Sequence, residues 1–169
     1  MANIIFIGFM GSGKSSMGRY MMNKYGYTHI DTDEYIEQQQ KRTINDIFAN
    51  EGEAYFRDLE TKCINDILAM DRDDLIIAVG GGLPMSEVNQ KLLKKLGRIV
   101  YLRASEDTLV NRLKGDKKRP LLQNGDLRDR IRELFNRREE TYIGLSDVIV
   151  DTDNCSYEAV YTDIMEGLK

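Results

Sequence analysis

The stretch from Gly8 to Ser15 constrains this chain most, because GFMGSGKS matches the phosphate-binding pattern G-x-x-x-x-G-K-[ST] at every defined position. It follows the apolar run Ile4–Ile7, typical of a buried strand, and precedes a helical pattern over residues 15–24. Glycines let successive N–H groups turn inward, and the helix N-terminus adds the positive end of its dipole. A turn that merely joined a strand to a helix would not require Lys-Ser after its last glycine. The stretch therefore predicts a nucleoside triphosphate site, with Lys14 on the β- and γ-phosphates and Ser15 on Mg²⁺.

The composition is that of a soluble globular protein. Hydrophobic residues make up 41% and charged residues 31% of the 169 positions, which fits one domain over residues 1–169. Acidic residues number 28 against 24 basic, and no basic block stands out beyond residues 117–119, so we expect no nucleic-acid partner. No apolar run is long enough to span a membrane, and residues 1–3 lead directly into a strand. We therefore expect no signal peptide and no membrane partner.

The cysteines and the single histidine do not indicate a metal or disulfide site. Cys63 falls on an apolar helical stripe and is expected in the core, whereas Cys155 lies in a polar loop. Two widely separated cysteines support neither a disulfide framework nor a zinc site, so a reducing cytoplasm is the expected location. His29 has no neighbouring ligands and is interpreted as structural. We expect a monomer.

Short runs rich in Ile and Val alternate with helical patterns, which predicts a doubly wound α/β fold. The predicted strands are Ile4–Ile7, Tyr27–Asp31, Leu75–Val79, Ile99–Leu102 and Val148–Val150. The predicted helices cover residues 15–24, 33–41, 43–49, 51–70, 86–96, 105–114, 127–142 and 156–168. Near-continuous apolar strands suit a sheet buried on both faces, so we expect a five-stranded parallel sheet with helices on both sides.

Two acids end the second predicted strand. Asp31 and Asp33 would point to the same side if the strand continued through both. Ligands bind at the carboxyl ends of strands in such sheets, so these acids should lie near the phosphate loop. There they could hold Mg²⁺ and orient a nucleophilic hydroxyl. An Asp that caps the next helix is the alternative, and it would explain one acid but not both.

Three glycines, Gly80, Gly81 and Gly82, follow the third predicted strand. Successive glycines offer bare N–H groups and let a ligand approach the backbone closely. A simple turn from strand to helix normally needs fewer of them. We therefore expect the run to bind a ligand, with the simple turn as the alternative.

The arginines call for separate interpretations. Arg57 lies four residues after Glu53 and three before Glu60, so a surface ion pair worth about 0.3–0.5 kcal/mol is an alternative to a binding role. Arg138 shares a face with apolar residues and should point inward, where an unpaired charge would be costly. Arg119 lies in a basic loop over residues 115–126 without apolar periodicity, and it could move onto a transferring phosphate or remain an ordinary loop charge.

Taken together, these motifs resemble the shikimate kinases. The similarity extends from the first strand to the last helix and rests on the order and spacing of the phosphate loop, D-T-D, F-R, G-G-G, R-P-L-L and R-E-E-T-Y. The resemblance implies ATP-dependent phosphorylation of the 3-hydroxyl of shikimate, on the pathway to chorismate and aromatic amino acids. It also implies a P-loop kinase architecture with a mobile substrate-binding segment over about 33–61 and a lid over about 112–126.

The resemblance further implies roles for individual residues. The implied ATP-binding residues are Gly11, Ser12, Gly13, Lys14, Ser15, Ser16, Arg112 and Arg119. The implied shikimate-binding residues are Asp33, Arg57, Gly80, Gly81, Gly82 and Arg138. Lys14, Asp33 and Arg119 are the implied catalytic residues, and Ser15 and Asp31 the implied Mg²⁺ ligands. Ser16 departs from the Thr that is frequent in the family, and residues 152–157 match it poorly, so no adenine contacts are assigned there.

Two other functions remain open at this point. A kinase for another small molecule, such as gluconate or a nucleoside monophosphate, would share the phosphate loop. A regulator that uses nucleotide binding as a switch would share it too, but would not require Asp33, Arg57 and Arg138 together.

Overall fold

The structure is a computed structural model that describes residues 2–123 and 125–169. Met1, in the predicted lead into the first strand, and Asn124, in the predicted lid, lie outside the described residues. No helix among the described residues combines the length and the apolar character needed to cross a membrane.

Five parallel strands form one sheet in the order β2-β3-β1-β4-β5. The strands are β1 (Ile4–Ile7), β2 (Thr28–Asp31), β3 (Leu75–Ala78), β4 (Arg98–Arg103) and β5 (Val148–Asp151). Each begins and ends within one residue of its predicted bounds. The apolar runs mark these strands well because both faces of the sheet are covered.

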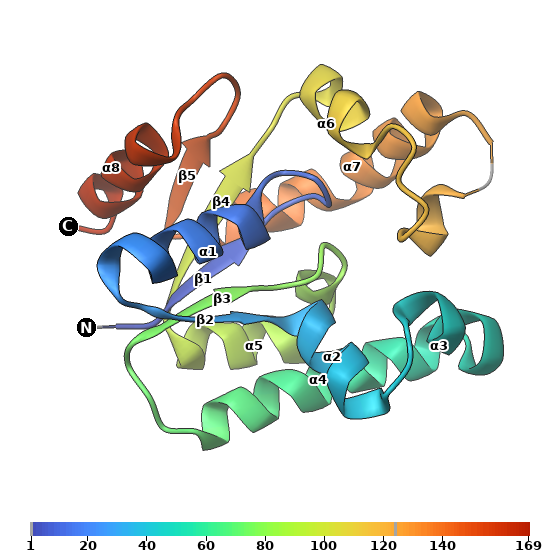
Figure 1. Cartoon of the computed structure of the whole chain (residues 1–169), viewed down its shortest axis with the longest axis horizontal. Coiled ribbons are helices and arrows are strands. Elements are labelled where there is room, and N and C mark those ends of the chain that lie inside the picture. Colours follow the sequence, from blue (N-terminus) through green and yellow to red (C-terminus); the bar gives the residue numbers. More distant parts are fainter. Residues whose placement is uncertain (1, 124) are drawn as a thin grey trace.

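Helices cover both faces of the sheet, and short 3₁₀ turns lie within two of the segments that connect these elements. The helices are α1 (Lys14–Tyr25), α2 (Thr32–Gln40), α3 (Ile44–Glu51), α4 (Glu53–Ala69), α5 (Glu87–Leu96), α6 (Glu106–Leu113), α7 (Leu127–Leu145) and α8 (Tyr157–Gly167). The 3₁₀ turns are η1 (Leu83–Met85) and η2 (Pro120–Leu122). In Figure 1, α3 and the segment with η2 project beyond the carboxyl ends of the strands, away from the two termini.

Alternate residues of β1 point into two different cores. Ile5 and Ile7 belong to a core shared with α4, α5 and α7. Ile4 and Phe6 belong to a second core shared with α1 and α8. Figure 1 accordingly shows α1 and α8 on one side of the sheet and α4 and α5 on the other. The predicted doubly wound α/β fold is confirmed.

The predicted boundary between the third and fourth helices is wrong, and the helix predicted over residues 127–142 extends to Leu145. The helix predicted over residues 51–70 begins only at Glu53, because Gly52 has a φ of 86° and separates α3 from α4. The Gly52 N–H donates to the Phe48 carbonyl at 3.1 Å and closes the end of α3. Apolar spacing alone could not mark this break, since both helices bury residues in the same core. The sharp corner directs α3 away from α4 and toward the site described below.

Asn3 joins β3, α5 and the loop before β3 at the amino ends of the strands, a role that the sequence did not indicate. Its Nδ2 donates to the carbonyls of Arg72 at 2.8 Å and Leu96 at 3.1 Å, and its Oδ1 accepts from the Leu75 N–H at 2.9 Å. The residue is only 5% exposed. Three backbone groups therefore depend on one buried amide for their hydrogen bonds.

Replacing Asn3 with Ala should lower the free energy of unfolding by about 2–4 kcal/mol, because buried backbone groups lose their partners. Urea unfolding of the variant measures this difference. Asn23→Ala, at an exposed position of α1, is the control and should change the free energy by less than about 0.5 kcal/mol. Equal effects from the two variants would contradict the role assigned to Asn3.

Candidate active site

Three adjoining pockets lie around the phosphate loop at the carboxyl ends of the strands. The largest has a volume of about 590 Å³ and includes Lys14, Ser15, Asp31, Asp33 and Arg119 in its walls. A smaller pocket of about 60 Å³ shares Asp33 and Arg119 with it, and a third of about 180 Å³ lies on the other side of the phosphate loop. Every residue predicted for the site lines one of the three. The predicted residues are Gly11, Gly13, Lys14, Ser15, Ser16, Asp31, Asp33, Gly80, Gly81 and Arg119 in the largest, Arg57, Gly82 and Arg138 in the smaller, and Ser12 and Arg112 in the third.

The phosphate loop holds Lys14 inside its own curve. The Lys14 Nζ donates to the carbonyls of Gly8 at 2.8 Å and Phe9 at 3.0 Å. Gly8 has a φ of 149°, and a Cβ there would lie 2.5 Å from the Leu102 carbonyl oxygen, so the loop requires glycine at this point. Burial lowers the pKa of Lys14 to about 7, and the Arg119 charge acts in the same direction, against Asp33 and Asp31.

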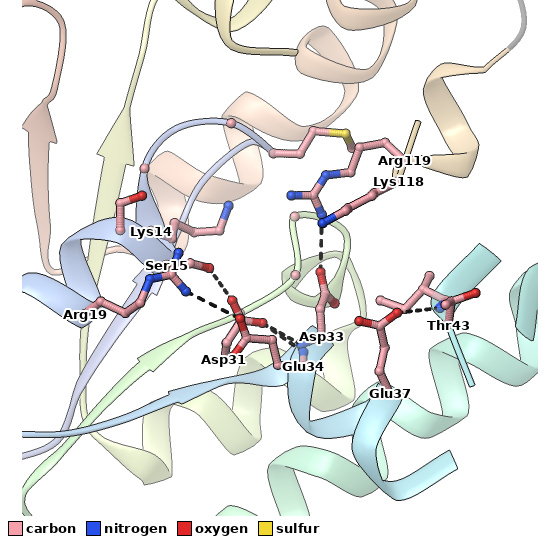
Figure 2. A pocket seen from close by; sticks show the side chains of 18 of the residues that line it. Lys14, Ser15, Arg19, Asp31, Asp33, Glu34, Glu37, Thr43, Lys118 and Arg119 are labelled. Atoms are coloured by element: carbon pink, nitrogen blue, oxygen red, sulfur yellow. Dashed lines mark hydrogen bonds and ion pairs between the residues drawn. The ribbon is translucent and has the colours of Figure 1, made fainter. Parts of the chain in front are cut away.

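Asp31 and Ser15 meet at the start of α2. The Ser15 hydroxyl donates to Asp31 Oδ2, while Asp31 Oδ1 accepts from the N–H groups of Asp33 at 2.9 Å and Glu34 at 3.1 Å. Asp31 is therefore the N-cap of α2 as well as a neighbour of the phosphate loop. The alternative in which an Asp caps the next helix is therefore correct for Asp31, and β2 ends at this cap and does not continue through Asp33. Figure 2 shows Ser15 and Asp31 pointing toward each other.

Asp33 reaches the pocket from the first turn of α2 instead of from the strand. Its Oδ2 accepts from Arg119 at 3.5 Å, a contact that Figure 2 shows across the cavity. Its Oδ1 is buried and has no hydrogen-bond partner among the described residues. Burial raises the pKa of Asp33 to about 6, and the Asp31 charge adds to the rise, while Arg119 and Lys14 oppose it. The carboxylate is thus ionised at neutral pH but unusually basic.

The glycine turn lies between two guanidinium groups. A Cβ on Gly82 would lie 2.6 Å from both terminal nitrogens of Arg57, and one on Gly81 would lie 3.1 Å from an Arg138 nitrogen. Both glycines are needed for this close approach. Arg138 points inward, as predicted, and is only 5% exposed. One of its terminal nitrogens has no hydrogen-bond partner in the described part of the chain.

Glu60 is a residue of the site that sequence reasoning treated only as a surface partner. It is fully buried, and its Oε1 accepts from Arg57 at 2.7 Å. The surface alternative holds only for Glu53, which accepts from Arg57 at 3.1 Å at the exposed end. Burial raises the pKa of Glu60 to about 7 against the effect of Arg57. Its position three residues after Arg57 on α4 was the available signal, since such pairs share a helix face.

Two residues of the predicted lid, Lys118 and Arg119, line the large pocket together with the first residues of α3. Asn45 Nδ2 donates to the Lys117 carbonyl at 3.0 Å, which joins α3 to the lid. Although residues 115–126 lack apolar periodicity, the segment is anchored, because Leu122 in η2 is buried and Leu121 packs against the main core. Pro120 opens η2 and produces this short turn. Figure 2 shows Lys118 and Arg119 facing Asp33 and Glu37 across the pocket.

The third pocket joins the phosphate loop to the loop after β5. Arg112, at the end of α6, donates to the Gly11 carbonyl at 3.0 Å. Thr152 and Cys155 line the same pocket from the opposite side. Ser16, the position that departs from the family, lies between this pocket and the largest one. Among the described residues, no group of three or more His, Cys, Asp or Glu side chains could hold a metal ion.

Asp33→Asn should stabilise the fold at neutral pH by about 1–3 kcal/mol, because the native state carries an unfavourable buried charge there. A raised pKa in the folded state means that the ionised form costs stability above about pH 6. The gain should therefore shrink as the pH falls from about 6 toward 3.8, the ordinary pKa of an aspartate. Urea unfolding at pH 7.5 and pH 4.5 measures both effects. A variant less stable than wild type at pH 7.5 would contradict the assignment.

Comparison with known proteins identifies the family. The shikimate kinase family model matches residues 10–169. The chain is 37% identical over 169 residues to the shikimate kinase of Persephonella marina, covering 100% of both chains. It is 41% identical over 166 residues to that of Thermodesulfovibrio yellowstonii, covering 98% of this chain and 94% of the other. The structure of the Acinetobacter baumannii shikimate kinase in complex with shikimate is similar with a TM-score of 0.93 and 32% identity, covering 99% of this chain and 93% of the other. The chain therefore belongs to the shikimate kinase family.

Proposed function

We propose that this chain transfers the γ-phosphoryl group of ATP to the 3-hydroxyl of shikimate, giving shikimate 3-phosphate and ADP. The observation that supports this best is the pairing of Arg57 and Arg138 around Gly81 and Gly82, directly beside Asp33 and the phosphate loop. Guanidinium forks bind planar carboxylates in a bidentate manner, and shikimate is a small carboxylate with several hydroxyls. Membership of the shikimate kinase family, with a relative described in complex with shikimate, supports the same substrate.

In this proposal Asp33 acts on the acceptor hydroxyl, and the cationic side chains act on the transferring phosphoryl group. Asp33 accepts a hydrogen bond from the attacking hydroxyl, and its raised pKa makes it a better acceptor than an ordinary carboxylate. Lys14 and Arg119 stabilise the negative charge on the transferring phosphoryl group. The lid residues around Arg119 exclude water, which would otherwise compete as an acceptor.

Ser15 and Asp31 fit the Mg²⁺ that accompanies ATP. Both present oxygen atoms at the phosphate loop, and they already lie within hydrogen-bond reach of each other. Magnesium keeps waters and phosphate oxygens as ligands and needs only one or two protein oxygens, so a cluster of three acids is not required. The metal would neutralise phosphate charge during transfer.

ATP itself would lie along the phosphate loop in the proposed complex. Gly11, Ser12, Gly13 and Ser16 would supply backbone and hydroxyl contacts, and Arg112 would lie near the adenine in the third pocket. The proposal also includes action as a monomer in the cytoplasm, without nucleic-acid or membrane partners. The acidic composition supports the absence of a nucleic-acid partner.

A coupled assay for ADP with several acceptors tests the proposal against its rivals. We expect rapid ADP formation with shikimate, little with gluconate or nucleoside monophosphates, and little without an acceptor. Lys14→Ala should fold normally and lose nearly all turnover, because the phosphoryl charge loses its main counter-charge. Preferred turnover of another acceptor would indicate a different kinase, and nucleotide binding without acceptor-dependent turnover would indicate a regulator.

Arg57→Lys and Arg138→Lys should each raise the dissociation constant for shikimate about tenfold to a hundredfold, because lysine keeps the charge but loses the planar fork. ATP affinity should remain almost unchanged. Isothermal titration calorimetry with each ligand measures the affinities for shikimate and for ATP separately. Arg137→Lys is the matched control, since Arg137 is exposed and bonded to Glu133. Loss of ATP affinity in place of shikimate affinity would contradict the assignment.

Trypsin should cleave the lid after Lys117 and Lys118 more slowly when an ATP analogue and shikimate are both present, because the lid then closes over its ligands. Asn45→Ala removes the donor to the Lys117 carbonyl and should restore part of the cleavage. Asn50→Ala is the control, because the Asn50 amide donates to the Asp46 carbonyl within α3. Mass spectrometry of the fragments gives the rates. Equal cleavage rates with and without the two ligands would exclude lid closure.

A further inference from the structure

The glycine turn is held by hydrogen bonds from several separate elements. The Gly80 N–H donates to the Thr32 hydroxyl at 3.0 Å. The Gly80 and Gly82 carbonyls accept from the N–H groups of Leu83 and Met85, each at 3.1 Å. The Gly81 carbonyl accepts from the Tyr142 hydroxyl at 2.5 Å. All three carbonyls are thus occupied, while the N–H groups of Gly81 and Gly82 have no acceptor within the described part of the chain.

Tyr142 reaches this turn from the same face of α7 as Arg138. The two are four residues apart on the helix and therefore lie one turn from each other. Tyr142 is 0% exposed. Burial raises its pKa to about 12 against the effect of Arg138, so its hydroxyl keeps the proton that it donates. Tyr142 thus holds the Gly81 carbonyl, and Arg138 lies beside the Gly81 Cα.

The bond to the Gly81 carbonyl also fixes the direction of the next N–H group. The Gly81 C=O and the Gly82 N–H belong to one planar peptide unit, in which they point in opposite directions. Glycines resist rotation of such a unit less than other residues do, because they have no side chain. A donor that holds the Gly81 carbonyl on the α7 side therefore directs the Gly82 N–H away from α7. Gly82 and Arg57 both line the smaller pocket.

We propose that Tyr142 is a positioning residue for the acceptor substrate: by holding the Gly81 carbonyl, it directs the Gly82 N–H at the substrate carboxylate between Arg57 and Arg138. This inference rests on the proposed function. Tyr142 does not touch the substrate in this arrangement, and it acts only through the glycine peptide. Substitution of Tyr142 should therefore weaken binding of the substrate carboxylate and leave the binding of ATP unchanged.

A purely structural role for the hydroxyl is the rival explanation, and the chain offers a matched control for it. Tyr101 on β4 is 1% exposed and packs against Tyr142 with ring centroids 5.1 Å apart. Its hydroxyl donates to Glu139, away from the glycine turn. Tyr101→Phe therefore removes a buried phenol hydroxyl from the same aromatic pair without touching the glycine peptide.

Steady-state kinetics of the full chain compares Tyr142→Phe with Tyr101→Phe and wild type. Tyr142→Phe should raise the KM for shikimate about fivefold to tenfold, because one charge-assisted hydrogen bond to the carboxylate is misaligned. The KM for ATP and kcat should change less than about twofold, and Tyr101→Phe should leave all three constants within that limit. Both variants keep the ring and should lower the melting temperature.

The Gly82 amide gives a second readout by NMR. Its resonance should shift strongly on addition of shikimate in wild type and in Tyr101→Phe, and weakly in Tyr142→Phe. An unchanged KM for shikimate in Tyr142→Phe, or an equal rise in Tyr101→Phe, would overturn the inference alone. Failure of the wild type to phosphorylate shikimate would overturn the proposed function and this inference with it.

Discussion

Charged side chains with unfilled hydrogen bonds at the carboxyl ends of β1, β2 and β3 are the constraint on which the site depends. Parallel strands bring the phosphate loop, the α2 cap and the glycine turn to one edge, where the buried Lys14 and Arg138 lie around the partly buried Asp33. Four of the six buried side-chain atoms without hydrogen bonds in the described residues belong to Asp33, Glu60, Arg119 and Arg138. Such atoms are costly in a folded protein, and they are expected where ligands complete their hydrogen bonds. These unfilled hydrogen bonds thus lower the stability of the free protein at this edge and make it able to bind charged ligands.

The sheet and the phosphate loop could be predicted because local sequence determines them. Apolar runs buried on both faces identify the strands, and GFMGSGKS identifies the loop almost alone. The inward direction of Arg138 could be predicted too, because helical spacing places it among apolar residues. Asp33 shows the limit of this reasoning. Alternation would place Asp33 and Asp31 on one side only in a strand that continued through both. Asp31 instead caps a helix that begins at Thr32, so Asp33 reaches the pocket from the first helical turn.

The remaining features depend on contacts between distant segments, which no local pattern records. Tyr142 lies 61 residues from the glycine carbonyl that it holds, and Asn45 lies 72 residues from its partner in the lid. Asn3 similarly joins β3 and α5, although the chain near it reads as an ordinary strand entry. Glu60 is an intermediate case, because the pairing with Arg57 was visible but its burial was not. Because Glu60 is buried, this ion pair is part of the proposed carboxylate site and not a weak surface contact.

The carboxylate of the acceptor is central to this interpretation, and calorimetry of wild type with shikimate and with its methyl ester tests it most directly. The ester keeps the ring and its hydroxyls but removes the negative charge that Arg57, Arg138 and the free glycine N–H groups would bind. We expect the ester to bind at least about tenfold more weakly than the acid, the effect of losing one or more charge-assisted hydrogen bonds. Equal affinity for acid and ester would contradict the carboxylate site and, with it, the assignment of shikimate as the substrate.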